Sequence, residues 1–215
     1  MTADAREPVL LLHGLWTNRL VMSAIALALM RAGYAPVMLD YRSRRGTLAE
    51  HLDRIEARVA ALPCVRPHLI GHSMGGVLAL AWLMRQPAER PFGRTVLLGS
   101  PVSGCRAAQE FARHSAGRWL LGRSLELWRE PPALAALAIA PEREVGAIAG
   151  THAFGLGPLF VSLPGRSDGV TQVDETRNAG LADHVELPVS HTGMLFSPVV
   201  ARYCVAFLQR GRFQP

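Results

Sequence analysis

Residues 71–75, Gly-His-Ser-Met-Gly, constrain the fold of this chain more than any other part of its sequence. A short apolar run at 68–70 precedes them, and a helix-like run at 77–84 follows. This context predicts a strand that stops at a sharp turn, with a helix beginning directly behind Ser73. In so tight a turn a Cβ on either flanking glycine would collide with the neighbouring backbone. Ser73 is therefore expected to project outward beside the positive end of a helix.

A second apolar run, at residues 8–12, ends in His13-Gly14-Leu15-Trp16. If this run is also a strand of the sheet, its following loop lies at the same edge as Ser73. Gly14 permits a close approach of the backbone to a ligand there. His13 is expected to brace this loop rather than to take part in chemistry.

Two loops farther along the chain bring an acid and a histidine to the same edge. Asp168 follows an apolar run at 159–163, and His191 follows another that ends near residue 189. Open α/β sheets build their sites from loops at the carboxyl ends of strands, so these side chains are expected to meet Ser73. Asp174, six residues after Asp168, is the rival acid. His72 directly precedes the serine and is expected to point away from the site.

These motifs, in the order Ser, Asp, His, resemble a small α/β-hydrolase of the bacterial lipase and esterase type, and the resemblance covers nearly the whole chain. Residues 99–104, Gly-Ser-Pro-Val-Ser-Gly, also resemble a Gly-Thr-Pro-His-x-Gly stretch of many lipases, although Ser100 and the missing histidine depart from it. The resemblance implies a nucleophile, acid and base at Ser73, Asp168 and His191. It also implies an oxyanion hole from two backbone N–H groups, those of Leu15 and Met74.

The reaction implied by this resemblance is hydrolysis of a carboxylic ester through an acyl-enzyme, without metal or other cofactor. The same groups cleave thioesters or amides, or pass an acyl group to an alcohol. A protein of this fold can also bind ligands without catalysis. The sequence leaves these alternatives open.

Alternating strand and helix signals predict a single domain over residues 1–215, with a mostly parallel sheet of about six strands flanked by helices. The strands are expected near residues 8–13, 35–39, 66–71, 94–98, 159–163 and 183–187. The helices are expected near residues 21–32, 48–62, 75–86 and 197–209.

Residues 101–144 interrupt the alternation and are predicted to form two or three short helices. Inserted there, they would form a lid over Ser73, although an ordinary packed connection is the alternative. We expect Trp16, Trp119 and Trp128 to line a pocket for an apolar acyl group.

Composition narrows the possible partners and the cellular location. The net charge of +6 rests on arginine alone, and the arginines are dispersed except at Arg42, Arg44 and Arg45, which are interpreted as a solvated loop. No nucleic-acid partner is therefore expected, and the expected substrate is a small-molecule or lipid ester. Residues 1–7 lack the apolar core of a signal peptide, and glycines interrupt residues 145–165, so no stable membrane insertion is expected. Three scattered cysteines, Cys64, Cys105 and Cys204, indicate a reduced, cytoplasmic protein.

Overall fold

The structure of the protein is a computed structural model that describes residues 6–63, 66–87, 89–129, 139–140, 142–154 and 163–214. Its centre is one sheet of six parallel strands in the order β2-β1-β3-β4-β5-β6. The strands are β1 (Pro8–Leu12), β2 (Ala35–Leu39), β3 (His68–His72), β4 (Thr95–Leu98), β5 (Val145–Gly150) and β6 (Asp183–Leu187).

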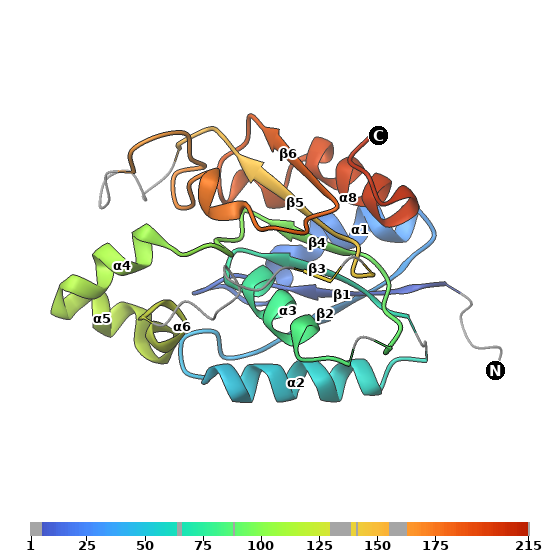
Figure 1. Ribbon diagram of the computed structural model, residues 1–215, viewed down its shortest axis with the longest axis horizontal. Helices are drawn as coiled ribbons and strands as arrows, with labels where there is room; N and C mark the ends of the chain where they lie inside the picture. The colour runs from blue at the N-terminus through green and yellow to red at the C-terminus, as the bar shows by residue number, and fades with distance from the viewer. Residues whose placement is uncertain are drawn as a thin grey trace.

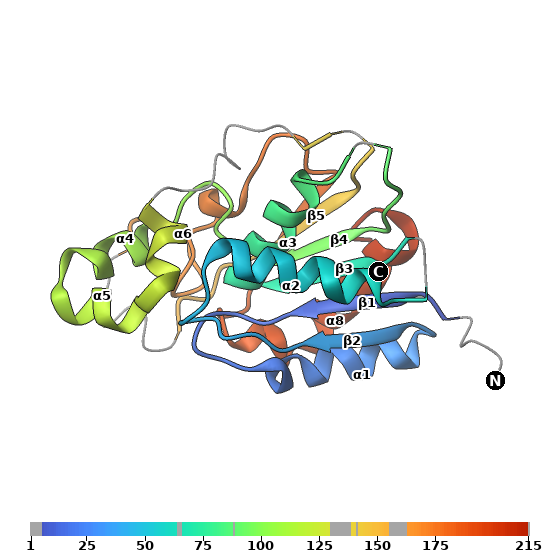
Figure 2. The same ribbon diagram turned by 90° about the horizontal axis from the view of Figure 1, so that it is seen from below.

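Helices cover both faces of this sheet (Figures 1 and 2). On one face lie α1 (Ser23–Arg31) and α8 (Pro198–Arg210), and on the other lie α2 (Leu48–Ala60) and α3 (Met74–Met84). Among the described residues the remaining helices are α4 (Arg106–Arg113), α5 (Ser115–Leu121) and α6 (Leu125–Arg129). Short 3-10 turns occur at η1 (Arg19–Met22), η2 (Gly122–Ser124), η3 (Asp174–Thr176) and η4 (Gly193–Leu195).

The apolar core forms two layers, one on each face of the sheet, because successive side chains of a strand point to opposite faces. In β1, Val9 and Leu11 belong to the layer that contains residues of α1 and α8. Leu10 and Leu12 belong to the layer that contains residues of α2 and α3. Burial on both faces explains why the central strands are almost continuously apolar.

Most of the predicted elements are confirmed, with boundaries shifted by one or two residues at most ends. The fifth strand is the exception. It was expected at residues 159–163, most of which lie outside the described residues, whereas the structure forms β5 at Val145–Gly150. Gly146 in this strand lies against α8, where an added Cβ would come within 2.4 Å of the Phe207 ring. The small side chains that allow this close packing also weaken the sequence signal for a strand.

The parallel arrangement brings the carboxyl ends of all six strands to one edge. The predicted short helices between β4 and β5 are confirmed as α4, α5 and α6, which project beyond this edge (Figures 1 and 2). We refer to residues 106–129 as the α4–α6 segment. Within the part of the chain that the structure describes, no helix combines the length and the apolarity needed to cross a membrane.

Candidate active site

Ser73 occupies the turn between β3 and α3 in a strained backbone conformation. Its φ of 53° and ψ of −123° are sparsely populated for a residue with a side chain, and such strain persists only where the surroundings enforce it. The Ser73 N–H donates a 2.8 Å hydrogen bond to the carbonyl of Leu98. A Cβ on Gly71 would lie 2.4 Å from the Cα of Gly76, and one on Gly75 would lie 2.4 Å from the Leu12 carbonyl oxygen. The steric role predicted for both glycines is therefore confirmed.

The loop after β1 approaches this turn closely at Gly14. A Cβ built on Gly14 would lie 3.3 Å from the Cβ of Ser73. The N–H groups of Leu15, in this loop, and of Met74, the first residue of α3, have no acceptor among the described residues. Leu15 lines the pocket in front of Ser73, and Met74 directly follows Ser73 in the chain.

His13 stabilises the loop after β1 through a hydrogen bond and a ring contact. Its Nδ1–H donates a 2.9 Å hydrogen bond to the Gly14 carbonyl, and its ring stacks on Tyr41 with centroids 4.1 Å apart. The Tyr41 hydroxyl in turn donates to the His13 carbonyl. Burial lowers the pKa of His13, so the imidazole is neutral near pH 7. These contacts agree with the bracing role expected of His13.

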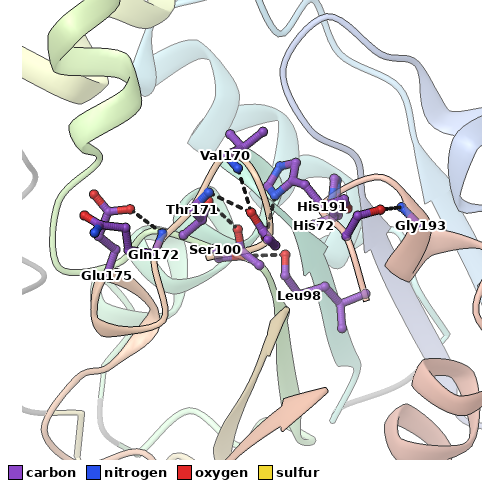
Figure 3. A network of polar contacts seen from close by, with 12 residues as sticks. His72, Leu98, Ser100, Val170, Thr171, Gln172, Glu175, His191 and Gly193 are labelled. Carbon is purple, nitrogen blue, oxygen red and sulfur yellow. Dashed lines mark hydrogen bonds and ion pairs between the residues drawn. The ribbon is translucent and has the colours of Figure 1, made fainter. Parts of the chain in front are cut away.

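Asp168 and His191 lie together at the carboxyl edge, after β5 and β6. His191 Nδ1–H donates a 2.7 Å hydrogen bond to Asp168 Oδ2, and the Asp168 side chain is 1% exposed. The other carboxylate oxygen accepts from the N–H groups of Val170 (2.9 Å) and Thr171 (2.7 Å), which orient it further (Figure 3). Because Nδ1 carries the proton, Nε2 of a neutral His191 is left as the basic nitrogen.

Sequence reasoning missed the part that Thr171 plays in this loop. Its hydroxyl donates a 3.1 Å hydrogen bond to the carbonyl of Gly99, which follows β4. Threonine directly after an Asp-Gly-Val turn was the only available signal. The contact ties the acid loop to the neighbouring strand and so fixes the direction of the Asp168 carboxylate.

The rival acid lies elsewhere. Asp174 begins η3, and its side chain is 98% exposed and pairs at 3.9 Å with Arg177. It has no contact with His191 among the described residues. Of the two carboxylates, the structure brings only Asp168 to the histidine.

The prediction that His72 points away from the site is wrong. Its imidazole lines the same pocket as Ser73 and His191, and its ring centroid lies 4.7 Å from that of His191. Figure 3 shows the two labelled rings side by side. As the last residue of β3, His72 points to the same face as Ile70, which is the face covered by the loop that carries His191.

Ser73 and His191 open into one pocket of about 580 Å³. Apolar side chains make up most of its wall. They come from the chain between β1 and α1, from Cys105 and the α4–α6 segment, and from the region of η4 that follows β6: Leu15, Trp16, Val21, Cys105, Ala107, Ala108, Phe111, Leu120, Leu121, Trp128, Leu195 and Phe196. Trp16 and Trp128, both expected to line an acyl pocket, are among these lining residues.

Trp119, which was expected in the same wall, does not line this pocket. Its side chain is 68% exposed, and the guanidinium of Arg44 lies 4.4 Å from its ring centroid. Successive residues of a helix point about 100° apart, and here Leu120 lines the pocket whereas Trp119 does not. The cation–π contact holds Trp119 on the outer surface instead.

No part of the described chain gathers three or more His, Cys, Asp or Glu side chains in an arrangement that could hold a metal ion. Cys105 and Cys204 are buried and form no disulfide, whereas Cys64 lies outside the described residues.

Comparison with known proteins places this geometry in context. The sequence profile described as "Alpha/beta hydrolase family" matches residues 9–185. No curated protein matches the sequence. Among solved structures, the mature form of lipase BlEst2 from Bacillus licheniformis superposes with a TM-score of 0.71 at 14% identity, over 98% of this chain and 94% of that one.

Two other structures are similar over most of the chain. A hydrolase from Pseudomonas aeruginosa PA01 has a TM-score of 0.70 at 18% identity, with 97% of this chain and 91% of that chain covered. A metagenomic carboxyl esterase has a TM-score of 0.65 at 17% identity, with 88% of this chain and 65% of that chain covered. At such identities the likeness is one of fold.

Proposed function

This chain belongs to the alpha/beta hydrolase family, and we propose that it is a serine hydrolase that cleaves carboxylic esters with an apolar acyl group. The observation that carries the proposal is the 2.7 Å hydrogen bond from His191 to the buried Asp168 carboxylate, at a pocket that Ser73 also lines. Esterase and lipase names among the structural neighbours support the same class of substrate.

In the proposed reaction, His191 Nε2 takes the hydroxyl proton of Ser73 while the Ser73 Oγ attacks the ester carbonyl carbon. Asp168 holds the imidazole in the required tautomer and stabilises the imidazolium that forms. The proton then passes to the departing alcohol oxygen, which leaves an acyl-enzyme. A water molecule, deprotonated by the same nitrogen, then attacks the acyl carbon. The bond from that carbon to Ser73 Oγ breaks, His191 returns the proton to Oγ, and the acid is released.

The negative charge that develops on the carbonyl oxygen requires nearby donors. The N–H groups of Leu15 and Met74, which have no acceptor among the described residues, are the proposed oxyanion hole, and each is expected to stabilise the transition state by on the order of 3 kcal/mol. Because these donors belong to the main chain and are fixed by the strained turn and the His13 brace, they need little rearrangement during the reaction.

Ser73 is a better candidate for the nucleophile than Cys105, which lines the same pocket. Burial raises the pKa of the Cys105 thiol to about 12, so the reactive thiolate is almost absent near neutral pH. Cys105 instead supplies apolar surface to the wall that would receive the acyl chain.

The proposal is tested by measuring turnover of p-nitrophenyl esters of increasing acyl length, beside a thioester and an anilide. We expect the esters to be the preferred substrates and Ser73→Ala to reduce their turnover to background. Ser115→Ala, at an exposed position of α5, is the matched control and should be as active as wild type. Preference for the thioester or anilide would refute ester specificity, and undiminished turnover by Ser73→Ala would refute the assigned nucleophile.

A further inference from the structure

A second pocket, of about 640 Å³, lies between the loop that follows β2 and the α4–α6 segment. Four arginines line it: Arg42 and Arg45 from the loop, Arg54 from α2, and Arg123 from η2. All four side chains are exposed. In the described part of the chain none of the four guanidinium groups forms an ion pair or a hydrogen bond, whereas Arg90 and Arg94 pair with Glu56 and Glu144. The cluster thus concentrates cationic groups that form no ion pair or hydrogen bond within the described residues.

The acidic residues of this pocket do not balance its arginines. Asp40 and Glu50 are the two carboxylates among the lining residues, so four positive charges face two negative ones and a surplus of two remains. Glu50 is already engaged, because its Oε2 accepts a 2.8 Å hydrogen bond from the Thr47 N–H in the capping box of α2. Asp40 lies 3.7 Å from His13 Nε2. The surplus therefore matches the charge of a dianion.

Two buried rings also line the pocket, those of Tyr41 and His51, with centroids 5.1 Å apart. His51 is 5% exposed, and its Nε2 has no hydrogen-bond partner among the described residues. A buried polar nitrogen without a partner is uncommon in proteins, and it is one of the features that mark a place for a ligand or water. Burial lowers the pKa of His51, so the ring is neutral near pH 7 and can accept or donate one hydrogen bond.

We propose that this four-arginine pocket binds a phosphate-type dianion, either free phosphate or the phosphate group of a larger molecule. Planar guanidinium groups bind phosphate oxygens in pairs, and several of them converging on one hollow favour phosphate over a single carboxylate. The position is separate from the pocket of Ser73, which is mainly apolar.

A bound dianion would also join two parts of the fold. The N-terminal end of α2 lies beside α6 in both views (Figures 1 and 2). Arg44 already connects the loop to the α4–α6 segment through hydrogen bonds to the carbonyls of Trp119 (2.6 Å) and Leu120 (3.0 Å). Phosphate held by Arg45, Arg54 and Arg123 would add a further connection, because Arg123 belongs to that segment whereas Arg45 and Arg54 do not. Bound phosphate should therefore raise the thermal unfolding midpoint.

The test is isothermal titration of the full chain with inorganic phosphate and with phenyl phosphate, at an ionic strength kept constant with KCl. We expect saturable binding by wild type and by Ser73→Ala, since the site does not use the serine. The double variant Arg45→Gln/Arg54→Gln should raise the dissociation constant by about tenfold or more, through loss of charge-assisted hydrogen bonds. Arg202→Gln, an exposed arginine on α8, is the matched control and should bind as wild type does.

A second arm identifies the source of the phosphate. The same variants are sedimented with phosphatidylcholine vesicles that contain or lack phosphatidic acid. Saturable binding of free phosphate or phenyl phosphate supports a soluble ligand, and retention only on phosphatidic-acid vesicles, lost in the double variant, supports a lipid headgroup at the same site. Equal binding by wild type and the double variant in both arms, or no binding by either, would overturn the proposal. Matching thermal unfolding midpoints without ligand would show that the double variant is folded.

Discussion

The Nε2–H of His72 donates a 2.9 Å hydrogen bond to the backbone carbonyl of His191. The residue before the strained serine thus holds the main chain of the histidine that pairs with Asp168. His72 Nδ1 has no hydrogen-bond partner among the described residues, and a Cβ built on Gly14 would lie 3.0 Å from it. The ring therefore fills the space between the loop after β1 and the loop after β6.

His72 should make the stability of the protein depend on pH. Burial, with neighbouring His191 second, lowers its pKa from 6.5 to about 3. Between these values the unfolded chain binds a proton at His72 that the folded chain does not. The contribution of neutral His72 to the free energy of unfolding is therefore fully present above pH 6.5 and is lost as the pH falls toward 3.

Replacing His72 with glutamine keeps an N–H donor but removes this titration. The free energy of unfolding of His72→Gln should fall less steeply on acidification than that of wild type, by up to about 1.4 kcal/mol per pH unit. Urea unfolding at a series of pH values between 3 and 7 measures both slopes. The other buried histidines are common to both proteins, so identical slopes would contradict a neutral, buried His72.

Asp168 and Asp174 give a matched pair for the acid. Asp168→Asn should lower kcat on the order of 10⁴-fold, because an amide cannot hold the imidazole in the required tautomer or stabilise its cation. Asp174→Asn, at an exposed side chain, should leave kcat unchanged. Steady-state kinetics on one p-nitrophenyl ester measures both, and a larger loss for Asp174→Asn would identify Asp174 as the acid.

Substitutions of Trp128 and Trp119 test which of the two side chains lines the pocket. Trp128→Phe removes part of a ring that lines the pocket and should shift the preferred acyl length upward. Trp119→Ala, whose side chain lies outside, should leave the preference unchanged. Relative kcat/KM values across an ester series report the shift. The phenylalanine replacement is preferred for Trp128, since alanine at a buried tryptophan costs about 3–5 kcal/mol of stability. An unaltered preference in Trp128→Phe, or a shift in Trp119→Ala, would exclude this assignment of the wall.

The sequence predicts most of the sheet because its strands are short apolar runs bounded by turn residues. β3 and α3 could be located within one or two residues because glycines at 71 and 75 admit only a tight turn. β5 was not predicted because Gly146, Gly150 and the alanines of this strand have a low β propensity. Those small residues reflect packing against Phe207 and other tertiary neighbours, which a local pattern does not contain.

Some residues of the candidate site could likewise be predicted from the local sequence, whereas others depend on tertiary contacts. Asp168 and His191 could be named because parallel strands bring their following loops to one edge. The side to which His72 points depends on where β3 ends, and a strand that ends one residue later than expected turns this side chain into the site. The direction in which the Trp119 side chain points depends on how the short helix α5 is rotated about its axis. The contact between Trp119 and Arg44, which are far apart in the sequence, holds this side chain on the outer surface. The four-arginine pocket likewise needs Arg54 and Arg123 to meet the loop after β2, and their separation in sequence hides this.

If Ser73 is an activated nucleophile, a reagent specific for such serines should modify it covalently. The chain is incubated with a fluorophosphonate, which reacts with activated serines, and the modified peptide is located by mass spectrometry. We expect one adduct on Ser73, which is absent in Ser73→Ala and retained in Ser115→Ala. Labelling of Ser73→Ala at the rate of wild type, or no labelling of the folded wild-type chain, would contradict it.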